Sequence, residues 1–135
     1  MTILLKLTRR AALAGFAGAG GLLAAGRPGF SLAADPAERV LTEAAMSLFT
    51  DPAHVRQVGA ACLDRQELCG SRATLIEEIF GAERQRLASC ATTAEIHDWL
   101  RTRIREDFAA GRSVTVQGWV LARTEARLYA LATHA

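Results

Sequence analysis

Residues 92–111 read TTAEIHDWLRTRIREDFAAG, and this stretch carries the clearest helix pattern in the chain. It opens on Thr92-x-x-Glu95, a capping box in which each side chain bonds the backbone N–H of the other residue. Apolar residues then recur three or four positions apart, and Gly111 is a typical helix terminator. The stretch therefore predicts a long amphipathic helix, whose apolar face is made of Ile96, Trp99, Leu100, Ile104 and Phe108.

The opposite face of this helix is charged, and we expect it to face solvent. Arg103 and Asp107 lie one turn apart, a spacing that allows an ion pair along the helix. The other charged residues on this face are Asp98, Arg101, Arg105 and Glu106.

Two helix start signals lie upstream. Asp35-Pro36 and Asp51-Pro52 each place a capping side chain before a proline, which is favoured in the first turn of a helix. They predict one helix that ends near Phe49 and a second that ends at or before Gly70. A third, shorter helix is expected to follow: it begins at Ser71 or Thr74 and ends at Gly81, and the segment 82–90 adds one or two helical turns.

Downstream of Gly111 the apolar period changes from helical to alternating. The segment SVTVQGWV (residues 113–120) predicts two short strands or one extended arm around Gly118, with Trp119 anchoring it on the helices. Thr124 is expected to cap a final helix. The sequence thus predicts one mainly α domain over residues 34–135, a small bundle of four to five helices with a short extended arm or hairpin near the C-terminus.

The first 33 residues have the features of an export leader. Lys6, Arg9 and Arg10, with no acidic residue, precede the uncharged run Ala11–Ala25, and the small-residue site Ser31-Leu32-Ala33 follows. This order of segments is that of a secretory signal. The apolar run is shorter than the roughly 20 residues of a spanning helix and contains several glycines, so we expect no permanent membrane span.

Within this leader, Thr8-Arg9-Arg10-Ala11-Ala12-Leu13 resembles the twin-arginine (Tat) translocation motif, in which Thr8, the arginine pair and Leu13 match the pattern. It departs at Ala12 and Ala14, where the motif favours Phe and Lys. The resemblance implies export by the Tat translocase and a periplasmic location, with the protein tethered if the leader is not cut. The alternative is a general-secretion leader that happens to contain two arginines.

The last third of the chain also carries a resemblance, formed by the block 104–108, Gly111, 116–121 and 124–128. It is similar to a block in small twin-arginine-leader proteins of bacteria with no assigned activity, and it implies no site residue. In size, helical content and leader, the chain is loosely similar to small subunits of periplasmic flavin-dependent dehydrogenases, with no shared motif.

Charge limits the partners of the domain. Four of the sixteen basic residues lie in the leader, which leaves twelve against fourteen acidic residues, a net charge of about −2. A domain with no basic surplus is not suited to nucleic acid or to an anionic membrane surface.

Three cysteines lie beyond the leader, and an oxidising compartment permits a disulfide. If Cys62 and Cys69 share one helix, their Cα atoms are about 10 Å apart, too far for a bridge. Any bridge therefore uses Cys90, so Cys69–Cys90 is the candidate disulfide and Cys62–Cys90 the alternative. Three unbonded thiols, packed as small hydrophobic groups, are the other reading.

No pattern in the sequence points to catalysis or to a bound cofactor. The chain has no G-x-S-x-G elbow, no P-loop and, beyond the leader, no glycine-rich dinucleotide fingerprint, and its histidines and cysteines lack the paired spacing of zinc sites. We therefore expect a non-catalytic accessory or small subunit of a periplasmic oxidoreductase, which helps its larger partner in export or assembly. The alternative is a stand-alone periplasmic protein that binds a metal or ligand, or performs thiol chemistry, through Cys62, Cys69, Cys90 and His97.

The segment around Gly118 has two interpretations. In the first, Trp119 packs with Phe108 and Leu128 into one corner of the core. In the second, Trp119, Gly118 and Arg123 form an apolar docking edge, since Trp and Arg are typical interface anchors. We expect core packing to dominate, and the two interpretations are compatible.

Overall fold

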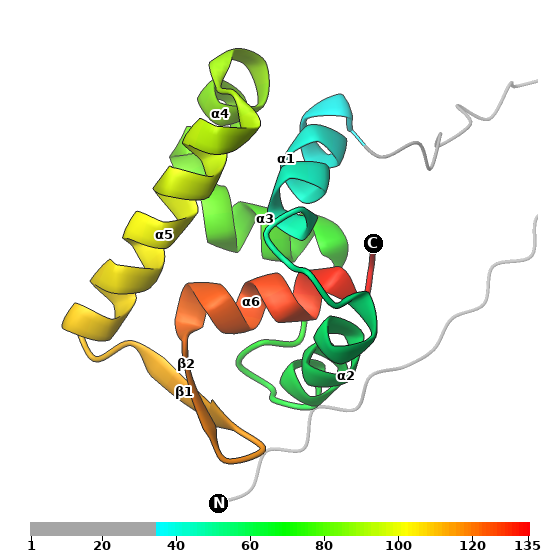
Figure 1. Ribbon diagram of the computed structural model, residues 1–135, viewed down its shortest axis with the longest axis vertical. Helices are drawn as coiled ribbons and strands as arrows, with labels where there is room; N and C mark the ends of the chain where they lie inside the picture. Colours follow the sequence, from blue (N-terminus) through cyan, green and yellow to red (C-terminus); the bar gives the residue numbers. More distant parts are fainter. Residues whose placement is uncertain (1–34) are drawn as a thin grey trace, which may run out of the picture. The chain divides into compact units, whose positions relative to one another are not determined.

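The computed structural model describes residues 35–135, and the predicted export leader with its twin-arginine motif lies outside them. The prediction of a mainly α fold with a hairpin near the C-terminus is confirmed (Figure 1). In chain order the elements are α1 (Pro36–Met46), α2 (Pro52–Leu63), α3 (Arg72–Phe80), a 3₁₀ turn (Gly81–Glu83), α4 (Arg84–Cys90), α5 (Thr93–Ala109), β1 (Ser113–Val116), β2 (Trp119–Ala122) and α6 (Arg123–Ala132).

The predicted starts of α1, α2, α3 and α5 are confirmed by their capping hydrogen bonds. The side chains of Asp35 and Asp51 accept the N–H groups of the residues two positions on, at 3.1 and 3.0 Å. Of the two predicted starts for α3, Ser71 is the cap. Thr92 and Glu95 form the predicted capping box at the start of α5. These starts depend on residues close in sequence, which is why sequence alone locates them.

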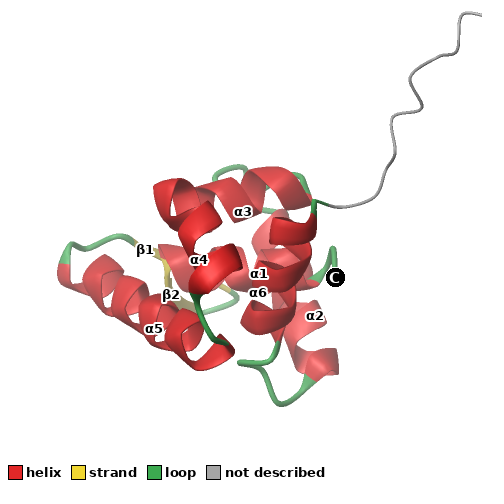
Figure 2. Ribbon diagram, turned by 90° about the horizontal axis from the view of Figure 1, so that it is seen from above, coloured by secondary structure: helices red, strands yellow, loops and turns green. Residues whose placement is uncertain are grey.

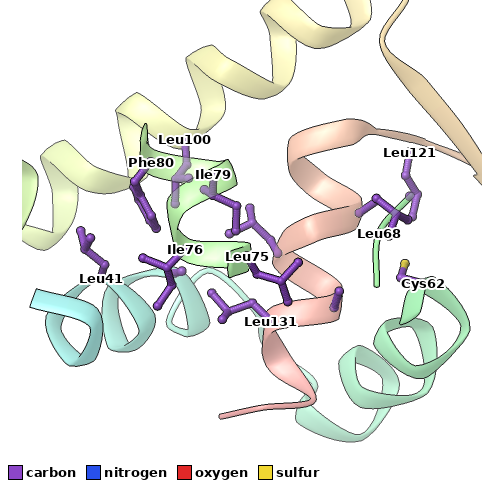
Figure 3. Close-up of a cluster of buried hydrophobic side chains, with 14 of the residues drawn as sticks. Leu41, Cys62, Leu68, Leu75, Ile76, Ile79, Phe80, Leu100, Leu121 and Leu131 are labelled. Atoms are coloured by element: carbon purple, nitrogen blue, oxygen red, sulfur yellow. The ribbon is translucent and has the colours of Figure 1, made fainter. Parts of the chain in front are cut away.

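Helix α6 is the centre of the packing. It contacts α1, α2, α3 and α5 and both strands, and in two perpendicular views α2 and α5 lie on opposite sides of it (Figure 1 and Figure 2). Every one of these partners contributes side chains to the core. Figure 3 shows part of this cluster, in which the fully buried residues include Leu41, Cys62, Leu75, Ile76, Leu100 and Leu131.

The hairpin turns tightly between its strands, which pair antiparallel with Val114 opposite Leu121 and Val116 opposite Trp119. Gln117 and Gly118 both have positive φ, at 49° and 83°. This combination is typical of the two-residue turns that match the twist of paired strands. The turn extends away from α5 and α6 (Figure 1). Of the two residues that flank it, Val116 is 4% exposed and belongs to the core, whereas Trp119 is 70% exposed.

The predicted core corner of Phe108, Trp119 and Leu128 is wrong for two of its three members. Leu128 is buried, but Phe108 is 47% and Trp119 70% exposed. Trp119 lies at the turn end of β2 and lines a surface groove instead of packing in the core, so it does not anchor the hairpin. Phe108 lies in the last turn of α5 and is likewise not covered by another element of residues 35–135. Val114 and Val116, the two valines of β1, are buried in the core.

Asp107 joins the end of α5 to the start of α6. Its Oδ1 accepts a hydrogen bond from Arg112 Nε at 2.8 Å, and its Oδ2 accepts one from the backbone N–H of Thr124 at 2.7 Å. The predicted Arg103–Asp107 pair is wrong, because Arg103 lies 3.4 Å from Glu106 instead. The prediction that Thr124 caps α6 is also wrong, because Thr124 lies inside the helix. Its backbone N–H donates a hydrogen bond to the carboxylate of Asp107.

Two opposing effects act on the Asp107 carboxyl. Burial favours its neutral form, but the hydrogen bonds from Thr124 and Arg112 outweigh burial and hold the pKa below its usual value. A lowered folded-state pKa stabilises the fold above the unfolded pKa of about 4. This stability is lost as the pH falls through the folded-state pKa.

Replacing Asp107 by asparagine should therefore lower the free energy of unfolding by about 1.5–3 kcal/mol at pH 7. The difference from the unsubstituted protein should shrink as the pH falls below about 4. Urea unfolding at pH 7 and at pH 3 measures both effects. Asp98→Asn is the matched control, because Asp98 is an exposed residue of the same helix, and it should change stability by less than about 0.5 kcal/mol. Equal effects of the two substitutions at pH 7 would contradict the assignment.

Candidate functional site

One surface of the described part of the chain gathers exposed apolar side chains. Residues 35–135 contain four exposed large hydrophobic side chains. Three of them, Phe108, Trp119 and Val120, line a single groove of about 380 Å³, and the fourth, Val40, lies outside it. We call it the Trp119 groove. Its lining comes from α2, the end of α5, β2 and α6, and comprises His54, Val58, Phe108, Trp119, Val120, Leu121, Glu125 and Tyr129.

Helical spacing and one close helix contact position this lining. Glu125 and Tyr129 are four residues apart on α6, so both face the groove, and His54 and Val58 repeat this spacing on α2. The two helices approach closely at Gly59, where an added Cβ would lie 2.1 Å from the backbone oxygen of Tyr129. The glycine thus brings two walls of the groove together.

Glu125 is the charged group of the Trp119 groove. Its Oε2 accepts the backbone N–H of Ala122 at 3.3 Å, and within residues 35–135 it forms no ion pair. Burial raises the pKa of Glu125, against a smaller opposing effect of the Ala122 hydrogen bond. The pKa of Tyr129 is raised by burial, then by the charge of Glu125. The groove therefore holds a half-buried carboxyl group without a cation.

Burial makes the thiol of Cys62 unreactive. Cys62 is fully buried, and its pKa is raised to about 11 by burial and by the charge of Glu125, against the opposing effect of Arg65. Since the thiolate is the reactive form, Cys62 acts as a core residue. Cys69 and Cys90 are exposed, and all three are free thiols. The structure contains no Cys69–Cys90 bond, and the bridge stays a prediction for the oxidised protein.

Alkylation of the native full chain at pH 8 should distinguish these thiols. Iodoacetamide is expected to modify Cys69 and Cys90 within minutes and to leave Cys62 unmodified, because its burial blocks access and keeps it protonated. Intact mass should show two adducts per chain in buffer and three in denaturant. Three adducts in buffer at similar rates would contradict the burial of Cys62, whereas fewer than two under reducing conditions would contradict the exposure of the others.

His97 has a structural position. Its Nε2 lies 2.8 Å from the carbonyl oxygen of Ala44 and 2.9 Å from Ser47 Oγ, so it joins α5 to the end of α1. In residues 35–135 no three His, Cys, Asp or Glu side chains are grouped as metal ligands. Cys62 lies on α2, Cys69 in the loop before α3, Cys90 on α4 and His97 on α5, and no three of these described residues are grouped as metal ligands.

Docking through Trp119, Gly118 and Arg123 stays a prediction, and the structure gives the positions of the three residues. Trp119 lines the groove and Gly118 forms the adjacent turn. Arg123 is exposed at the first position of α6 but is not part of the lining. Sequence analysis missed Glu125 and Tyr129, because their four-residue spacing on α6 is the ordinary spacing of any helix face.

No protein-family model, curated protein or solved structure matches this chain. None of the helices in residues 35–135 has the length and apolar character that crossing a bilayer requires.

Proposed function

We propose that this protein is an exported, non-catalytic accessory or small subunit of a larger periplasmic oxidoreductase, which aids the export or assembly of that enzyme. The partner binds in the Trp119 groove. The observation that carries this proposal is the clustering of three exposed apolar side chains, Phe108, Trp119 and Val120, around one concave surface. Exposed apolar clusters of this kind mark interaction sites, and tryptophan is one of the residues enriched at interface hot spots.

The leader supports the choice of partner. The twin-arginine route carries folded proteins, many of them loaded with a redox cofactor, and a small subunit with such a leader can bring a larger subunit with it. Residues 35–135 offer a helical scaffold with a docking groove, and a partner that holds the cofactor supplies the chemistry. Cys62 does not support a stand-alone thiol function, since it is buried and protonated at neutral pH.

The test is purification of the full chain, tagged at its C-terminus, from the periplasm of its native host. Native mass spectrometry and visible absorbance are read on the same eluate. We expect one larger protein at fixed stoichiometry, with the absorbance of a redox cofactor. A colourless eluate that contains this chain alone would contradict the proposal.

A further inference from the structure

Glu125 carries the only carboxyl group among the residues that line the Trp119 groove. It receives one hydrogen bond, 3.3 Å long, from the backbone of Ala122. The seven ion pairs of residues 35–135 all use other carboxylates. Taking a carboxylate out of water without a counter-ion is costly, and the raised pKa of Glu125 reports this cost. A cation in the groove would remove it.

The walls around Glu125 favour one class of cation. Phe108, Trp119 and Tyr129 give the groove three aromatic rings, and aromatic faces attract organic cations. A guanidinium group combines the two requirements of this surface, because it stacks on aromatic rings and donates paired hydrogen bonds to a carboxylate. Its three-carbon stem is apolar and suits the contacts with Val58 and Leu121. A hydrated metal ion would gain little from such walls.

We propose that the Trp119 groove receives an arginine side chain of the partner protein, with the guanidinium group on Glu125 and stacked on the aromatic rings, and with the stem against Val58 and Leu121. This inference rests on the proposed function, since it specifies the chemistry of the segment that docks. The groove volume of about 380 Å³ leaves room for the arginine and for an apolar residue beside it. The charge of Glu125 then selects the partner, and the aromatic rings supply most of the contact area.

The test uses butylguanidinium as the probe and butylurea as its neutral counterpart of similar shape. The full chain carries two tryptophans, so Trp99→Phe leaves Trp119 as the fluorescent reporter. Trp99 stacks on Phe80, away from the groove lining, and phenylalanine keeps this stacking. Both probes are titrated below the concentrations that unfold the protein. We expect saturable binding of butylguanidinium, with butylurea at least tenfold weaker.

Glu125→Gln is the decisive variant, because glutamine keeps an acceptor for Ala122 and removes the charge. It should reduce the preference for butylguanidinium over butylurea to less than twofold. Glu77→Gln, an exposed change on α3, should leave the preference unchanged. Circular dichroism checks that both variants are folded. Equal binding of the two probes, binding of neither, or an unchanged preference in Glu125→Gln would each overturn the inference.

Partner retention separates this inference from the proposed function. If Trp119→Ala releases the partner and Glu125→Gln retains it fully, docking at the groove stands and the arginine on Glu125 does not. If both variants release the partner at least tenfold faster, both proposals are supported. A small organic amine released from the purified protein in stoichiometric amount would overturn the partner as the source of the cation.

Discussion

Replacing Trp119 by alanine should weaken binding of the partner at least thirtyfold, while the free energy of unfolding of the protein changes by less than about 0.5 kcal/mol. The two effects separate because the side chain is 70% exposed and adds little to the fold. An aromatic anchor at the centre of an interface contributes about 2 kcal/mol or more when it is truncated, which corresponds to that factor in affinity. Retention of the partner on the tagged chain and urea unfolding measure the two quantities.

Val40→Ala is the matched control for this prediction. Val40 is 41% exposed on α1 and lies outside the Trp119 groove, so its truncation removes a similar kind of surface from another face. It should retain the partner as the unsubstituted chain does. Equal loss of the partner in both variants would point to a general effect of surface hydrophobicity, and no loss in Trp119→Ala would remove the groove as the docking site.

Replacing Gly59 by alanine should destabilise the protein by about 3 kcal/mol or more. The added Cβ would lie 2.1 Å from the backbone oxygen of Tyr129 and 2.8 Å from Thr133 Cγ2, and the backbone atom cannot rotate away. In a helix free of such contact, the same substitution would stabilise by roughly 1 kcal/mol. The sign of the change therefore reports directly on the α2–α6 contact. The midpoint of urea unfolding measures it.

Gly70→Ala is the control for the effect of adding a methyl group. The nearest side-chain atoms to its Cβ would lie 3.4 Å away, on Thr74, so we expect a change within about 0.5 kcal/mol. A Gly59→Ala variant as stable as the unsubstituted protein would mean that α2 and α6 do not approach at this point. The walls of the Trp119 groove would then be placed differently.

The sequence predicted the features that local rules determine. Asp35, Asp51 and Thr92 start helices because their side chains bond backbone groups two or three residues away. Gly118 marks the hairpin because a tight two-residue turn needs positive φ. Such short-range requirements can be read without knowing which elements pack together.

The failed predictions of burial and of the α6 cap depend on contacts between distant residues. Phe108 and Trp119 fit an apolar pattern, but burial requires another element to cover them, and none of residues 35–135 does so. Asp107 accepts a hydrogen bond from the backbone N–H of Thr124, seventeen residues away in sequence. The residues next to the start of α6 therefore do not reveal this contact. The isolation of Glu125 from cations likewise depends on which side chains the fold brings near.

The most direct test of docking at the Trp119 groove is site-specific photo-crosslinking in the native host. A photoreactive benzoylphenylalanine replaces Trp119 in one strain of the full chain and Val40 in another, and illumination is followed by purification and mass analysis. If the partner docks at the groove, position 119 gives one discrete adduct with a larger oxidoreductase and position 40 gives none with that protein. No adduct from position 119, or the same adducts from both positions, would contradict docking at the groove.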